Sequence, residues 1–182
     1  LQQTALAESA ELGGDWAAAR DAYRAALELD REYSPAAVGL ERADQQYKAE
    51  LFNGAMDEAL RALDKGRLAA AETALQQAAT IKPDAPVLRD ARQRLSDARQ
   101  RSALAGLRRG AADEARAENW QNAIGLYQRA LKIDANAGFA RRGLEQAEQR
   151  AALNQQFDRY LNDPQRLYSP EPLANAQRLL EQ

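Results

Sequence analysis

The sequence predicts an all-α protein built from repeated helices, and three observations carry this prediction. About a fifth of the 182 residues are alanine, and Leu, Arg, Glu and Gln are abundant, which is typical of helical proteins. Trp16 and Tyr23 recur 104 residues later as Trp120 and Tyr127. A weaker copy with Leu68 at the tryptophan position lies halfway between them. Three copies at one fixed spacing indicate a repeat architecture.

Composition narrows the function classes. The chain has no cysteine and no histidine, so it lacks thiolate ligands, disulfides and the side chain most often used for acid-base catalysis near neutral pH. The formal net charge of -2 does not favour nucleic acid as a partner. No sufficiently long run of apolar residues is present, so we expect no membrane insertion. We expect no cofactor, no metal and no enzymatic activity.

A short amphipathic helix is expected from Asp15 to Leu29, because its apolar residues are spaced by three or four and share one face. One glycine of the pair Gly13-Gly14 is expected to end the preceding helix, and Asp15 to cap the new one. Gly66 takes the turn position in the second copy, and Asn119 the capping position in the third.

Long helices of about 30 residues are expected between the short ones, at 34–65 and 85–118, each about 45 Å in length. Ser34 is expected to cap the first of them, with Pro35 as its first helical residue. A third long helix is expected at 137–161, and a fourth short one begins at Ser169 and Pro170 and carries Leu173, Ala176, Leu179 and Leu180. The whole chain, 1–182, is therefore predicted as a single helical repeat domain with copies at about 1–33, 34–83 and 84–135 and a partial fourth at 136–182.

The short helix and its preceding turn resemble the second helix of a tetratricopeptide repeat. The resemblance rests on Gly14-Asp15-Trp16 followed by Ala19, Tyr23 and Ala26, and on their counterparts in the other two copies. It implies an α-solenoid that binds other proteins. The family repeats about every 34 residues, so the period here is longer by about 18 residues, or about five helical turns. We therefore expect the family's packing at one end of each long helix and a projecting helical spur at the other.

The resemblance also implies a groove lined by the first helix of each repeat. Reversal of the charges at Arg108, Arg109 and Arg116 is expected to weaken the capture of a partner protein. A mixed apolar groove for an extended or helical segment is favoured over a clamp for a peptide carboxylate. The candidate partner-binding residues are Asn53, Met56, Leu60, Leu63, Arg108, Arg109, Ala112 and Arg116.

Two other groups of residues have structural interpretations that we favour. The repeated Trp and Tyr residues are expected to pack between helices rather than to form a binding platform. Eight arginines lie between Arg89 and Arg116, with four acids interleaved and no aromatic residue for base stacking. An ion-paired, solvated helix face is therefore favoured over a nucleic-acid site.

The predicted function is a non-catalytic scaffold for protein-protein interaction. The alternative is a self-assembly element, either a homodimer or a helical spacer, because Leu40, Ala43, Tyr47, Leu51 and Gly54 approach the spacing of a helical seam, and Leu88, Ala91, Leu95, Ala98 and Ser102 form a thinner one. Arginine outnumbers lysine 21 to 4, which indicates a bacterial chain. We expect a fragment of a longer protein, in the periplasm or cell envelope rather than the cytoplasm.

Overall fold

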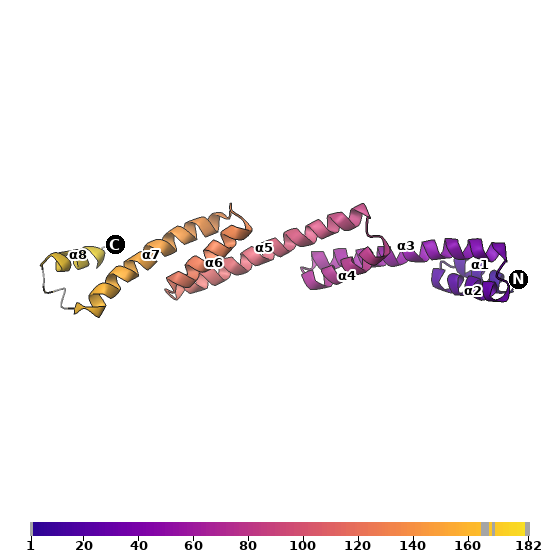
Figure 1. The fold of residues 1–182 in the computed structure, drawn as a ribbon, viewed down its shortest axis with the longest axis horizontal. Coiled ribbons are helices and arrows are strands. Elements are labelled where there is room, and N and C mark those ends of the chain that lie inside the picture. Colours follow the sequence, from indigo (N-terminus) through magenta and orange to yellow (C-terminus); the bar gives the residue numbers. More distant parts are fainter. Residues whose placement is uncertain (1, 165–167, 169, 181–182) are drawn as a thin grey trace. The chain divides into compact units, whose positions relative to one another are not determined.

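The computed structural model describes residues 2–164, 168 and 170–180, with the side chains of residues 179 and 180 excepted. The described part of the chain is all-α and contains no strand. Figure 1 shows the helices in chain order. They are α1 (Gln2–Leu12), α2 (Trp16–Leu29), α3 (Ser34–Asp64), α4 (Leu68–Ile81), α5 (Pro86–Arg116), α6 (Trp120–Ile133), α7 (Gly138–Asn162) and α8 (Pro170–Leu180).

The predicted alternation of long and short helices is confirmed. The short helices α2, α4 and α6 each have 14 residues, whereas α3 and α5 each have 31. One predicted cap is wrong: α3 begins at Ser34, and the carbonyl of Tyr33 accepts the first helical hydrogen bonds, so Tyr33 rather than Ser34 is the N-cap residue. Pro35 lies in the first turn, where its missing N–H costs no helical hydrogen bond.

The short helices α2, α4 and α6 each pack against the helix before and the helix after them, and each group of three helices forms one small core. The first core joins α1, α2 and the N-terminal half of α3 around Tyr23, which is 2% exposed. The second joins the C-terminal half of α3, α4 and the N-terminal half of α5 around Leu75 and Leu88. The third contains Tyr127 and Ala130 of α6, together with residues of α5 and α7.

The expectation of projecting spurs is wrong. The N-terminal half of α3 buries Ala36 and Ala43 in the first core, and the N-terminal half of α5 buries Leu88, Ala91 and Leu95 in the second. The physical reason is that the added turns carry an apolar face of their own, so both halves of α3 are packed. The residues of the predicted intermolecular seams Leu40, Ala43, Leu88, Ala91 and Leu95 are therefore used within the chain.

The turns before the short helices share one geometry. Gly14, Gly66 and Glu118 occupy the same position in successive copies of the repeat, and all have positive φ, at 75°, 66° and 60°. In each turn this residue donates its N–H to the carbonyl three residues back, and the next residue donates to the carbonyl five back. This pattern is the Schellman motif, which ends a helix with a left-handed residue. The prediction that a glycine of the Gly13-Gly14 pair ends the preceding helix is confirmed, with Gly14 as that residue, and so is the turn position of Gly66.

The capping predictions have different outcomes at the two related positions. The Asp15 carboxylate accepts a hydrogen bond from the backbone N–H of Ala18 at 2.9 Å, as predicted. Asn119 occupies the N-cap position of α6, but its side chain makes no capping hydrogen bond. The predicted capping bond of Asn119 is therefore wrong, although its position is right.

Backbone contacts divide the chain into two compact units, Leu1–Ala98 and Arg99–Gln182. The first two cores belong to the first unit and the third core to the second. In the second unit, α8 forms where a fourth short helix was predicted, and Leu173 is 43% exposed. Ser169 and the side chains of residues 179 and 180 lie outside the described residues.

Candidate functional site

The middle of α3 carries an open helical face. The residues of this face are Tyr47, Glu50, Leu51, Gly54, Ala55 and Glu58, which are spaced by three or four and so share one side of the helix. Here α2 packs on the first half of α3 and α4 on the second, which leaves the turns between them less covered. Two pockets of about 490 and 520 Å³ border this face and share Glu50 and Leu51. We call the two together the α3 groove.

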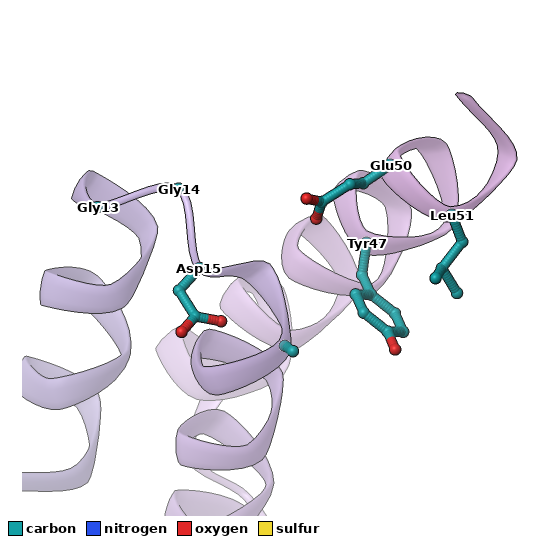
Figure 2. Close-up of a pocket in the computed structure, with 7 residues that line it drawn as sticks. Gly13, Gly14, Asp15, Tyr47, Glu50 and Leu51 are labelled. Carbon is teal, nitrogen blue, oxygen red and sulfur yellow. The ribbon is translucent and has the colours of Figure 1, made fainter. Parts of the chain in front are cut away.

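The first pocket of the α3 groove lies beside the turn that begins α2. Its lining combines Gly13, Gly14 and Asp15 with Tyr47, Glu50 and Leu51 of α3. Figure 2 shows Tyr47 and Leu51 extending together on one side of the helix, with Glu50 directed away from them. The Arg20 guanidinium lies 4.2 Å from the centre of the Tyr47 ring and is itself ion-paired with Asp44. These contacts fix the tyrosine at one wall of the pocket.

The second pocket lies beside the last turn of α4. Gly54, Ala55 and Glu58 of α3 line it together with Gln77, Thr80 and Ile81 of α4. Leu51, which belongs to both pockets, is 45% exposed. Glu50 and Glu58 are exposed, and no ion pair of either is present among the described residues. With Asp15 of the first pocket, which also has no ion pair among the described residues, the groove combines an apolar centre with three carboxylates, a surface suited to an apolar group flanked by cations.

A third pocket, of about 380 Å³, lies between the start of α6 and α7. It repeats the position of the first pocket two copies further along the chain, since Glu118, Asn119 and Gln121 replace Gly14, Asp15 and Ala17. Its chemistry differs, because five carboxamides line it: Asn119, Gln121, Asn122, Asn154 and Gln155. A carboxamide both donates and accepts hydrogen bonds, as a peptide group does. The acids Glu118 and Asp158 also line this pocket, which is therefore suited to polar ligand groups such as an exposed main chain or a cation.

The predicted groove residues of α3 lie mostly in the protein core. Met56 is 5% exposed within the second core, and Leu60 and Leu63 are half-buried against it. These three side chains therefore support the packing of α4. Asn53 is exposed.

The predicted groove residues of α5 lie at the surface. Arg108, Arg109, Ala112 and Arg116 are all exposed. The Arg108 guanidinium lies 5.7 Å from the centre of the Phe139 ring, and Arg116 is ion-paired with Asp113. Arg109 has no ion pair in the described part of the chain, so it is the arginine of this set with an uncommitted charge.

The α3 groove was not predicted from the sequence. The sequence pattern places Tyr47, Leu51 and Gly54 in a seam between chains, and the acids at 50 and 58 have no part in that prediction. The signal was present in the spacing: Glu50 and Glu58 each lie four residues from Gly54, one helical turn on either side.

Within residues 2–164, 168 and 170–180, no group of three acidic, histidine or cysteine side chains is arranged to hold a metal ion. The same part of the chain has no helix with the length and apolarity needed to cross a bilayer.

Comparisons with protein-family models, with curated proteins and with solved structures give no match to this chain.

Proposed function

We propose that this chain is a non-catalytic scaffold for protein-protein interaction, a tetratricopeptide-like α-solenoid that binds a segment of another protein. The observation that carries the proposal is the recurrence of a surface pocket at the same place in two copies of the repeat, beside the turns at Gly14 and Glu118. Repeat proteins use such recurrent positions to contact extended partners.

The different linings of the two pockets support a role in recognition. One has Asp15, Tyr47 and Glu50, whereas its counterpart has carboxamides and Trp120. Positions that serve only the fold keep the same kind of side chain: Ala19, Ala71 and Ala123 are all buried alanines at 0% exposure. Related surface positions that differ in chemistry while the core stays constant are what a binding array requires.

A polypeptide is the ligand class that suits these pockets. They are shallow surface features formed by helices, and they offer hydrogen-bonding and apolar groups rather than a cluster of catalytic side chains. A bacterial origin and an envelope location are part of the same proposal and rest on the sequence alone.

The test is affinity capture with the immobilised chain from a bacterial lysate and its detergent-solubilised envelope fraction, with captured proteins identified by mass spectrometry. We expect a small set of proteins that free chain displaces. A variant with Arg108→Glu, Arg109→Glu and Arg116→Glu is expected to lose part of this set while its circular dichroism is unchanged. A matched control, Arg92→Glu with Arg94→Glu, reverses exposed charges elsewhere on α5.

Absence of any displaceable protein would contradict the scaffold function. Equal capture by the folded triple variant and the control would remove the three arginines from the binding site and leave the pockets to be tested by substitution at Leu51 and Asn154.

A further inference from the structure

The part of the α3 groove beside α4 has an acidic side chain near each end. Its α3 wall consists of Glu50, Leu51, Gly54, Ala55 and Glu58, and the facing wall consists of Gln77, Thr80 and Ile81 of α4. The α3 residues recur at i, i+1, i+4, i+5 and i+8, which keeps them on one side of the helix. Glu50 and Glu58 are therefore about 12 Å apart along the helix axis.

The stretch between these two acids is open and apolar. Gly54 lies midway between them, and a Cβ atom added there would have no neighbouring atom within 4 Å. Leu51 is exposed, and Ile81 is half-buried on the facing wall. The Glu50 side chain extends away from Leu51 (Figure 2), which leaves the apolar centre uncovered. An apolar side chain from a partner has room here and would remove Leu51 from water.

The two acids are not neutralised by neighbouring cations. Neither Glu50 nor Glu58 forms an ion pair among the described residues, and no described lysine or arginine lines this pocket. Arg61, nearly one turn after Glu58, is ion-paired with Asp57 at 3.8 Å. Lys82, which follows Ile81, lies 5.1 Å from the centre of the Phe52 ring. The surface therefore offers two exposed negative charges on either side of an apolar centre.

We propose that this part of the α3 groove binds a basic segment of a partner protein, in which a large apolar residue has a lysine or arginine on each side. This inference rests on the proposed scaffold function and names the partner chemistry of one of its surfaces. In an extended segment, alternate residues point to the same face and lie about 6.6 Å apart. A basic residue at i, an apolar residue at i+2 and a basic residue at i+4 thus span about 13 Å.

This span matches the separation of the two acids along α3. When each cation meets one carboxylate, the apolar side chain between them lies over Gly54, against Leu51 and Ile81. The long stems of lysine and arginine cover apolar surface while their charged ends reach the carboxylates in water.

The first test is titration of the isotope-labelled whole chain with a peptide of sequence Ala-Arg-Ala-Leu-Ala-Arg-Ala, blocked at both ends, and NMR detection of the backbone amides. We expect saturable shifts that gather at residues 50–58 and 77–81. Binding should weaken as salt is raised, because the carboxylates are at the surface. One control peptide has glutamic acid in place of both arginines, and another has serine in place of leucine. Each is expected to bind about fivefold more weakly or less.

The second test changes the groove. The double variant Glu50→Gln with Glu58→Gln removes both charges and keeps the shape, and it is expected to weaken peptide binding by about fivefold or more. The matched control is Glu41→Gln, an exposed acid of α3 that lines neither pocket of the groove. Gly54→Gln is expected to abolish binding by filling the apolar centre. Its control is Gly125→Gln in α6, where an added Cβ also meets open space. Glutamine is a good helix former, so these variants should fold.

No saturable shift at about 1 mM peptide would overturn the proposal. Equal binding of the acidic peptide, or unchanged binding by the folded double variant, would also overturn it. Sedimentation of a dimer that Gly54→Gln converts to a monomer would assign this groove to a second copy of the chain instead. Capture from the lysate separates the two proposals. Displaceable proteins without peptide binding would contradict only the present inference, whereas peptide binding without any captured protein would contradict the scaffold function.

Discussion

The ring of Tyr23 lies directly over Gly39, so closely that a Cβ atom at residue 39 would fall within 3.0 Å of three ring atoms. Tyr127 and Gly143 repeat this arrangement two copies further along the chain. In the middle copy the corresponding residues are Leu75 and Ala91, both buried in the second core. The large tyrosine ring therefore packs on a glycine, and the smaller leucine side chain packs on an alanine. This match in size keeps the short and long helices closely packed in every copy.

Gly39→Ala is expected to lower the free energy of unfolding by about 1–3 kcal/mol, because the new methyl group overlaps a buried ring. Urea denaturation followed by circular dichroism measures this change. Gly54→Ala serves as the control, since its methyl group meets open space and should stabilise the helix by about 1 kcal/mol. Equal effects of the two substitutions would contradict the close contact.

The double variant Tyr23→Leu with Gly39→Ala recreates the Leu75–Ala91 pair of the middle copy. Tyr23→Leu alone leaves a gap over glycine, which the added methyl group of alanine partly fills. We expect the double variant to be more stable than the sum of the two single effects predicts, with a coupling of about 0.5–3 kcal/mol in a double-mutant cycle. Strict additivity would show that the two residues do not share a packing constraint.

Glu118→Gly is expected to raise stability by about 1 kcal/mol. Glu118 has φ of 60°, at the turn position where the other two copies have glycine, and a side chain in this region is strained. The reciprocal change Gly66→Glu should lower stability by a similar amount. Thermal unfolding of both variants checks the prediction, and a stabilising effect of Gly66→Glu would refute it.

Asp15→Ala is expected to cost about 1 kcal/mol of stability, because the Asp15 carboxylate accepts the hydrogen bond from Ala18 at the start of α2. Asn119→Ala is the matched variant at the start of α6, where the side chain makes no such bond. Its cost should be smaller. Chemical denaturation of the two variants distinguishes them, and a larger loss for Asn119→Ala would contradict the assignment of the caps.

Tyr23 should make stability fall at alkaline pH. Burial raises the pKa of Tyr23 above its usual value of 10.0, and the nearby Glu11 carboxylate adds to this effect. Because the folded-state pKa is the higher one, the stabilising contribution is complete below the unfolded-state pKa and is lost as pH rises from there through the folded-state value. In a pH series of urea unfolding, Tyr23→Phe should therefore show a shallower loss of stability than the parent protein. Parallel curves throughout the alkaline range would disprove this.

Much of the fold could be predicted from the sequence, because the governing signals are local. The spacing of Trp16, Ala19 and Tyr23 defines a helical face, and glycine at Gly14 and Gly66 permits the left-handed residue that ends the preceding helix. The helix bounds follow from such signals almost to the residue. The prediction of spurs is wrong because helical periodicity says that a face is apolar without saying which neighbour covers it.

The candidate site was harder to predict. The resemblance to tetratricopeptide repeats predicts Met56 as a groove residue, yet it is buried in the second core. The α3 groove depends on where α2 begins and α4 ends along one helix, which is a relation between elements far apart in sequence.

The sequence by itself determined the helices, their turns and the period of the repeat, since each depends on the conformational preferences and spacing of neighbouring residues. Only the tertiary structure decided that both halves of α3 are packed, that the ring of Tyr23 packs on Gly39 and that Gly54 faces open space. Gly39 and Gly54 are the same residue type in the same helix. They differ in what lies across from them, which the local sequence does not encode.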